Sequence, residues 1–233
     1  MDELLINGLE ELNISYTKDM LDRLSIFYEM LIEKNKVMNL TRITDETDFI
    51  TKHVLDSLLL AKVTDISGMK VLDLGTGAGF PGIPLKIFFP GAVMVLADSL
   101  KKRLVFLDDV ISTLGLSDIR TVHGRAEDLG HGKEYREQFD IVVSRAVADM
   151  YVLSEYCIPF LKTAGSFTAY KSNGTDEEIN RSADHIRELG GRVPEIRDIP
   201  LYGTDIIRRM VTVCKEKNTP KQYPRKPGKI VFT

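Results

Sequence analysis

The sequence has few of the features that mark several common protein classes. Its two cysteines, Cys157 and Cys214, lie far apart in apolar surroundings, so neither a disulfide framework nor a cysteine zinc site is predicted. No uninterrupted apolar stretch approaches the roughly 18 residues of a transmembrane helix, and the start Met1-Asp2-Glu3 has no basic signal region. The histidines have no metal-ligand spacing. We therefore expect a cytoplasmic protein with no membrane span and no metal site.

The composition is that of a folded globular protein. Of 233 residues, 43% are hydrophobic and 28% charged, which excludes collagen, a coiled coil and wholesale disorder. The net charge of −3 argues against a protein that coats nucleic acid by bulk charge alone. Residues 215–233 nevertheless carry six lysines and arginines beside one acidic residue. Tails of this kind can meet phosphates, so residues 218–233 are predicted to form a separate basic C-terminal tail.

The rest of the chain divides into a helical part and an α/β part. In residues 1–62, apolar side chains recur at helical spacing between charged positions, which predicts an N-terminal helical cap. Residues 63–217 alternate short apolar runs with helical segments, which is typical of βα units around a parallel sheet. The predicted strands are 70–74, 92–97, 119–123, 139–144 and 165–170, closed by a pair near 192–201 and 208–215. The order predicts a Rossmann-like doubly wound sheet with an antiparallel edge strand.

The most informative motif is a glycine-rich turn between the first strand and the helix after it. It reads Asp73-Leu-Gly75-Thr-Gly77-Ala-Gly79-Phe80-Pro, and glycines there let the backbone turn sharply and let a ligand approach closely. The same stretch contains a GxGxxG pattern, so a dinucleotide site is one interpretation. Asp73 favours S-adenosylmethionine instead, because a carboxylate suits a ligand ammonium better than a pyrophosphate.

Two further turns extend this ligand site. Asp98 closes the second strand about twenty residues on, where a carboxylate can accept both ribose hydroxyls of an adenosine, and Ser99 follows it. After the third strand, Ala126 and Glu127 are candidates to contact an adenine ring. With the glycine loop, these residues match the order of motifs in class I S-adenosylmethionine-dependent methyltransferases.

Almost the whole chain resembles the small-subunit (16S) rRNA 7-methylguanosine methyltransferases, the glucose-inhibited division protein B family. The resemblance rests on several motifs in the right order: residues 35–41 with Asn39, His53-Val-Leu-Asp56-Ser, 73–84, 98–103, Ser144-Arg145-Ala146, Lys171 and Tyr223-Pro-Arg225-Lys226-Pro-Gly. Lys34 stands where this family usually has tryptophan. The resemblance implies methyl transfer from S-adenosylmethionine to N7 of one guanosine in 16S rRNA. It also implies cofactor contacts at Gly75, Phe80, Ala126, Glu127 and Arg145.

The residues suit that chemistry. N7 of guanine has a lone pair and no proton to lose, so positioning and electrostatics can suffice without a general base. Consistent with this, the fourth strand ends in Ser144-Arg145 rather than in the Asn/Asp-Pro-Pro-aromatic loop used on exocyclic amines. Arg145 follows a parallel strand where ligands sit, so we expect it to act in catalysis by clamping the guanosine, a phosphate or a cofactor carboxylate.

The expected substrate is an unpaired or extruded guanosine of 16S rRNA, in the small ribosomal subunit or in an assembly intermediate. The candidate substrate-binding residues are Asn39, His53, Asp56, Lys101, Arg125, Lys171, Arg225 and Lys226. We expect the protein to be a monomer.

Other functions remain open from the residues alone. An NAD-dependent oxidoreductase would need a Tyr-x-x-x-Lys pair or similar, and Tyr151 is followed by Glu155 at that spacing. A non-catalytic rRNA assembly factor is disfavoured by the intact loop and Asp98. A methyltransferase acting on a protein or a small molecule has the same cofactor motifs.

Overall fold

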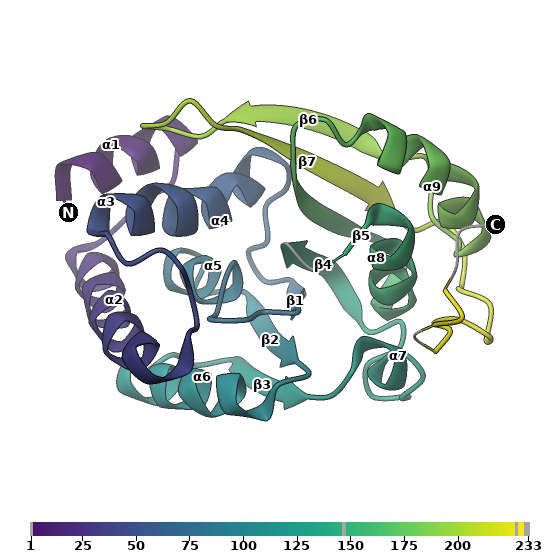
Figure 1. Cartoon of the computed structure of the whole chain (residues 1–233), viewed down its shortest axis with the longest axis horizontal. Coiled ribbons are helices and arrows are strands. Elements are labelled where there is room, and N and C mark those ends of the chain that lie inside the picture. The colour runs from purple at the N-terminus through teal and green to yellow at the C-terminus, as the bar shows by residue number, and fades with distance from the viewer. Residues whose placement is uncertain (1, 146–147, 227, 231–233) are drawn as a thin grey trace.

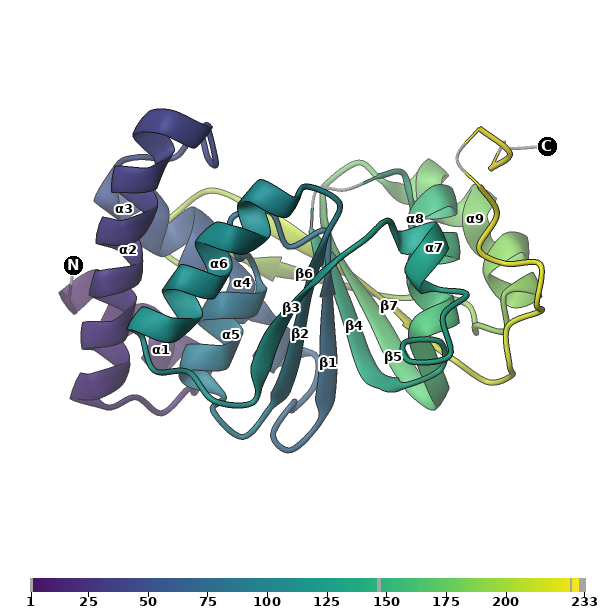
Figure 2. The ribbon, with the colours of Figure 1, turned by 90° about the horizontal axis from the view of Figure 1, so that it is seen from below.

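The computed structural model describes residues 2–145, 148–226 and 228–230. Ala146 and Pro227, which belong to two of the sequence motifs, lie outside the described residues. A twisted sheet separates two helical layers (Figure 2). One layer contains α5 (Gly82–Phe88), α6 (Lys101–Thr113) and the N-terminal helices, and the other contains α7 (Ala126–Leu129), α8 (Met150–Cys157) and α9 (Asp176–Glu188).

The sheet has seven strands in the order β3-β2-β1-β4-β5-β7-β6. The strands are β1 (Lys70–Leu74), β2 (Val93–Asp98), β3 (Ile119–His123), β4 (Phe139–Arg145), β5 (Leu161–Ser172), β6 (Glu195–Pro200) and β7 (Ile207–Cys214). The first five strands pair in parallel, and β7 pairs antiparallel with both β5 and β6. The predicted doubly wound sheet is therefore confirmed. The antiparallel strand lies one position inside the edge, which β6 forms.

Strand side chains alternate between two hydrophobic cores, as period-two geometry requires. In β1, Val71 packs into the core shared with the N-terminal helices, and Leu72 packs into the core beneath α8 and α9. The order of strands reverses between β1 and β4, which are neighbours although their first residues, Lys70 and Phe139, lie 69 positions apart in the chain. Ligands of such sheets bind at the carboxyl ends of the strands beside this reversal.

The N-terminal cap consists of α1 (Asp2–Leu12), α2 (Lys18–Met38) and a third helical segment over residues 46–62. Thr17 caps α2 by accepting a hydrogen bond from Met20 N, and Asn39 ends it in the left-handed region with φ 48°. Figure 1 shows the third segment as one continuous helical ribbon. It is not a regular α-helix, because its centre is a π-helix (Phe49–Leu55), followed by α4 (Asp56–Leu58) and a 3₁₀ turn (Leu59–Lys62).

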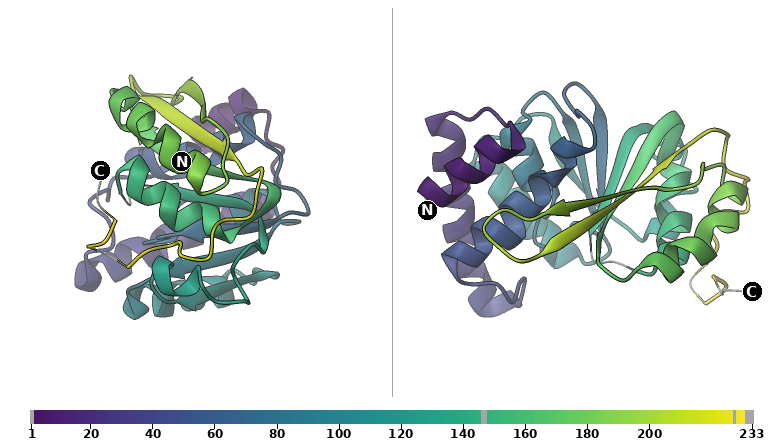
Figure 3. Two further views of the ribbon diagram at one scale, coloured as in Figure 1. Left: turned by 90° about the vertical axis from the view of Figure 1, so that its right-hand side faces the viewer. Right: turned by 90° about the horizontal axis from the view of Figure 1, so that it is seen from above.

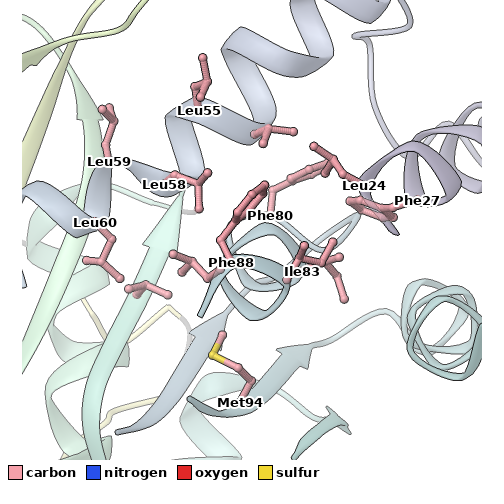
Figure 4. Close-up of a cluster of buried hydrophobic side chains, with 14 of the residues drawn as sticks. Leu24, Phe27, Leu55, Leu58, Leu59, Leu60, Phe80, Ile83, Phe88 and Met94 are labelled. Atoms are coloured by element: carbon pink, nitrogen blue, oxygen red, sulfur yellow. The ribbon is translucent and has the colours of Figure 1, made fainter. Parts of the chain in front are cut away.

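Aromatic packing joins the cap to the glycine-rich loop. The ring of Phe80 lies 5.4 Å from that of Phe27 in α2 and 6.1 Å from that of Phe49, measured between ring centroids. Figure 4 shows Phe80 among the cap side chains Leu24, Phe27 and Leu58. The hairpin of β6 and β7 also reaches across to the cap (Figure 3), where Arg197 donates a hydrogen bond to the Lys62 carbonyl.

The basic C-terminal segment packs against the body of the protein, beside α8 and α9 (Figure 1). Tyr223 is 5% exposed, and its hydroxyl donates a hydrogen bond to Glu188. Arg136 donates to four main-chain carbonyls, three of which belong to residues 219–223. Residues 218–226 are therefore held by specific contacts rather than extending as a free tail.

Candidate active site

The glycine-rich loop leaves the carboxyl end of β1 and turns into α5. Gly75, Gly77 and Gly79 all have positive φ, at 76°, 60° and 99°. A Cβ at Gly77 would meet only the Gly75 carbonyl oxygen, at 3.9 Å, whereas one at Gly79 would lie 2.7 Å from Ile83 Cγ1. Gly77 therefore faces open space, and Gly79 faces the core.

Asp73 lies beneath this loop and is fully buried. Its Oδ2 accepts hydrogen bonds from the Thr76 hydroxyl, at 2.7 Å, and from Gly82 N, at 2.8 Å. Burial raises the pKa of Asp73 to about 6, against the lowering effect of these two bonds. Asp73 holds the shape of the loop, and it is not among the residues that line the cavity described next.

A cavity of about 560 Å³ opens over the carboxyl ends of β1, β2, β3 and β4. Of the predicted site residues, it is lined by Gly75, Gly77, Phe80, Asp98, Ser99, Ala126, Glu127, Arg125, Arg145 and His53. The volume falls in the range of roughly 300–1,000 Å³ that is usual for small-molecule sites. The fold thus brings most of the predicted site residues together from five separate segments of the chain.

Asp98 connects the second strand to the glycine-rich loop. Its Oδ2 accepts a hydrogen bond from Gly77 N at 3.0 Å and contacts Arg103 Nη1 at 3.3 Å. Its Oδ1 accepts from Leu100 N at 2.8 Å. The carboxylate is thereby fixed in the cavity wall, where its remaining lone pairs can accept hydroxyl groups.

One end of the cavity is formed by the turn after β3 and by α8. Ala126, Glu127 and Tyr156 line it. Glu127 is 7% exposed, and within the described chain its Oε1 has no hydrogen-bond partner, with Arg125 Nη1 at 3.7 Å as its nearest cation. A buried acceptor without a donor is costly, so this oxygen suits a ligand that supplies an N–H group.

The opposite end of the cavity is formed by Arg145, His53 and the loop after α2. Arg145 Nη1 donates to Asp56 Oδ2 at 2.7 Å and to the Lys52 carbonyl at 3.2 Å, and Nη2 lies 3.1 Å from His53 Nδ1. Its guanidinium also lies 5.3 Å from the Phe80 ring centroid. Arg145 is therefore both a lining residue and a member of an ion pair with the cap.

His53 is held in one neutral form. Because an arginine can only donate, Nδ1 accepts from Arg145, and the proton is on Nε2, which donates to Thr41 Oγ1 at 2.8 Å. The imidazole stacks on Phe80 with centroids 4.1 Å apart. Burial, and then the charge of Arg145, lowers the pKa of His53 to about 3.

The other predicted substrate-binding residues lie outside the cavity. Asp56 is fully buried behind Arg145, and Lys171 bonds to the Ala148 carbonyl and Glu178. Arg225 is paired with Glu155, whose pKa is lowered to about 2 by hydrogen bonds from His185 and Arg225, although burial alone would raise it. Asn39, Lys101 and Lys226 are exposed. Among these residues, only the exposed ones are free to meet a substrate directly.

Nine residues that line the cavity were not among the predicted site residues. Four of them carry side chains that can shape a ligand site: Leu40, Thr41, Arg103 and Tyr156. Leu40 and Thr41 lie in the polar break after α2, and Arg103 lies in the run of cations after Asp98. Their positions inside motifs already noted, residues 35–41 and 98–103, could have identified them as site residues. Tyr156 had no such signal, because nothing in the sequence distinguishes it from Tyr151, the other tyrosine of α8.

The fold and the site together define a class I methyltransferase. The chain has the strand order of that class, and its glycine-rich loop, the acid ending β2 and the turn after β3 surround one cavity. Solved structures agree at the level of the fold. The TYW2 protein of M. jannaschii in complex with AdoMet gives a TM-score of 0.56 at 15% identity over 75% of this chain and 79% of that one. A SAM-dependent O-methyltransferase from Thermotoga maritima gives 0.53 at 17% identity over 82% and 72%.

Sequence comparison is more specific. Residues 20–199 match the family model described as rRNA small subunit methyltransferase G. Proteins named Ribosomal RNA small subunit methyltransferase G are 47% identical in Lachnoclostridium phytofermentans, over 96% of this chain and 93% of that protein, and 42% identical in Clostridium novyi, over 97% and 93%. The chain belongs to the rRNA small subunit methyltransferase G family. The resemblance seen in the motifs and the prediction of a methyltransferase are thereby confirmed.

Two structural findings bear on the remaining expectations. Over the described ranges, no helix is long and apolar enough to cross a membrane. Among the same residues, no three His, Cys, Asp or Glu side chains converge as metal ligands would.

Proposed function

We propose that this protein transfers the methyl group of S-adenosylmethionine to N7 of a guanosine in 16S rRNA. The observation that carries the proposal is one cavity with two unlike ends. One end offers glycine backbone, Asp98 and a Glu127 oxygen that accepts no hydrogen bond within the described residues, and the other offers Arg145 beside a stacked pair of rings. A nucleoside cofactor fits the first end, and an acceptor base fits the second.

The residues present fit S-adenosylmethionine. Gly77 leaves open the space that a Cβ would fill, and Asp98 can accept the ribose hydroxyls. Among the described residues, Glu127 Oε1 lacks the donor that an adenine amine would supply. Ala126 and Phe80 add apolar wall, and Ser99 lies beside Asp98. Asp73 and Gly79 contribute indirectly, because they set the shape of the loop from beneath. When bound, the cofactor supplies an electrophilic methyl group on a sulfonium.

The acceptor end suits a nucleophile that has no proton to lose. His53 is neutral, and both of its ring nitrogens are already hydrogen-bonded. Ser144 is fully buried, and its Oγ donates to the Leu74 carbonyl at 2.8 Å. Neither is placed as a general base. The N7 lone pair of guanine needs orientation rather than deprotonation, which Arg145 and the neighbouring rings can supply.

The guanosine must leave its stack to reach this cavity, because the major groove of A-form RNA is too narrow for side chains to reach N7. Arg125 stands at the cavity with its side chain 67% exposed, and Lys101 and Lys102 are exposed at the start of α6. These three cations can contact the phosphates flanking an extruded base. Lys171 and Arg225 are better assigned to internal ion pairs.

The test is transfer of labelled methyl groups from S-adenosylmethionine to RNA from cells that lack this gene. Free 16S rRNA, assembly intermediates and mature small subunits would be offered separately, and the modified base mapped. We expect label on N7 of one guanosine in at least one of these substrates. Label on another atom, on a protein, or on none of them would contradict the proposal.

A further inference from the structure

Three charged side chains from three distant segments meet behind the acceptor end of the cavity. Asp56, at the start of α4, accepts from Arg145 of β4 at 2.7 Å through one oxygen and from Arg208 of β7 at 2.6 Å through the other. Asp56 is fully buried, while the side chains of Arg145 and Arg208 are 13% and 19% exposed. The carboxylate is thus enclosed between two guanidinium groups.

These contacts use one side of the Arg145 guanidinium. Both N–H groups of Nη1 are accounted for by Asp56 and the Lys52 carbonyl, and one N–H of Nη2 by His53. Within residues 2–145, 148–226 and 228–230, neither Nε–H nor the second N–H of Nη2 donates a hydrogen bond. Arg145 lines the cavity, so these two donors are the ones it has left for a ligand there.

Asp56 cannot reach a ligand itself, because it is fully buried and does not line the cavity. It can act only through Arg145. A flexible arginine has several rotatable bonds, and a fixed acceptor selects one orientation of its planar head. Arg208 in turn fixes the second oxygen of Asp56, and it also contacts the Lys171 carbonyl at 3.4 Å.

We propose that Asp56 and Arg208 are positioning residues, which aim the free donors of Arg145 at the acceptor base. The sequence interpretation of Asp56 as a direct substrate contact is replaced by this indirect role. The proposal rests on the proposed function, since it assumes that the cavity methylates RNA. It adds that the hairpin of β6 and β7, far from the cofactor loop in sequence, takes part in the reaction.

The first test compares neighbouring arginines of β7. Arg208→Lys keeps the charge but not the planar head, and should lower the single-turnover methylation rate about tenfold at saturating RNA. Arg209→Lys is the matched control. Arg209 is similarly ion-paired, with Asp198 and Asp176, but adjacent strand residues face opposite sides of the sheet. Its variant should stay within twofold of wild type. Equal rates for the two variants would overturn the proposal.

The second test is a double-mutant cycle. Asp56→Asn should slow the reaction on the order of 100-fold, the cost of a misplaced reacting group. If Asp56 acts through Arg145, the double variant with Arg145→Ala should be no slower than Arg145→Ala alone. If all three variants fold and the rate loss of the double variant is the product of the two single losses, the positioning role is refuted. If Asp56→Asn does not fold, the comparison of Arg208 with Arg209 still decides.

A third measurement does not depend on methylation. Long-range ¹H–¹⁵N spectra report the protonation of each His53 nitrogen, and Nδ1 is the atom that accepts from Arg145. Arg208→Lys should shift the Nδ1 resonance, because Arg145 moves, and Arg209→Lys should leave it in place. An unmoved resonance in both variants would overturn the proposal. A shifted resonance in a protein that methylates no RNA would instead place the failure with the proposed function.

Discussion

Two glycines of the same loop should respond to alanine in opposite ways. Gly77 lines the cavity, and a Cβ there meets nothing closer than 3.9 Å. Gly79 does not line it, and a Cβ there would lie 2.7 Å from Ile83 and 2.9 Å from Leu107. Gly77→Ala should therefore impair binding of the demethylated cofactor, and Gly79→Ala should impair stability.

The magnitudes follow from backbone conformation and contact. Gly77→Ala places an L residue in the left-handed region, which costs about 1–2 kcal/mol of folding free energy. Gly79→Ala adds overpacking of about 1–3 kcal/mol to backbone strain of about 1–3 kcal/mol. At roughly 2–4 °C per kcal/mol for a chain of this size, Tm should fall by roughly 2–8 °C for Gly77→Ala. For Gly79→Ala it should fall by roughly 4–24 °C.

The assay is titration calorimetry with the demethylated cofactor, at a temperature where both variants are folded, beside thermal melts without ligand. We expect at least a tenfold weaker Kd for Gly77→Ala and a change within threefold for Gly79→Ala. The reverse pattern, with binding lost at Gly79 and retained at Gly77, would refute the assignment of which glycine faces the ligand.

Four further outcomes are expected. At one hundred times its Kd, S-adenosylmethionine should add about 2.7 kcal/mol of stability and raise Tm by roughly 5–11 °C, while NAD leaves it unchanged; the opposite result in a thermal-shift assay would reverse the cofactor assignment. Deleting residues 218–233 should lower Tm by roughly 6–12 °C, because the buried Glu155 loses its partner Arg225 at a cost of about 3 kcal/mol. It should reduce the salt slope of RNA binding by at most about three units, for the exposed Lys221, Lys226 and Lys229; an unchanged Tm would mean that the segment is not held against the fold. Ser144→Ala should cost about 1 kcal/mol in denaturant titrations through its lost bond to the Leu74 carbonyl and leave single-turnover methylation near wild type, whereas a severe rate defect would count against a base-free mechanism. The pKa of His53 is about 3 in the folded protein, below its unfolded value, so its contribution to stability is present above pH 6.5 and is lost as pH falls. Between pH 6.5 and pH 4, the wild type should therefore lose about 3 kcal/mol more free energy of unfolding than His53→Gln. If the free energy of unfolding falls equally with pH in both proteins, the buried neutral imidazole is contradicted.

Much of the fold was predictable because its signals are local. The strands at residues 70–74 and 119–123 were predicted with the bounds that the structure gives. The first is mostly apolar, and the second contains the β-branched residues Ile119, Thr121 and Val122, which favour strands. The glycine-rich loop and the acid that ends β2 were also predictable, since strand, turn and helix adjoin along the chain. The π-helix was not, because its apolar spacing resembles that of an α-helix.

The side-chain partners at the site were less predictable, because they come from distant segments. Arg145 meets Asp56, 89 residues earlier in the chain, and Asp56 meets Arg208, 152 residues later. Charge counting indicated a separate basic tail, yet Arg225 in it pairs with Glu155 from 70 residues away. Composition gives the charge of a residue but not its partner. Charged residues that line the cavity therefore cannot be told apart, from the sequence alone, from those in ion pairs inside the fold.

The position of Phe80 makes the cap and the ligand loop a single cooperative unit. Its ring is a wall of the cavity and also a member of the aromatic cluster with Phe27 and Phe49. Local opening of the cavity wall at Phe80 must disturb the aromatic cluster, and opening of the cluster must disturb the wall. We therefore expect the backbone amide hydrogens of α2 and of the glycine-rich loop to exchange with solvent through the same opening event. Ligand bound over the loop will then slow hydrogen exchange in helices that it never touches.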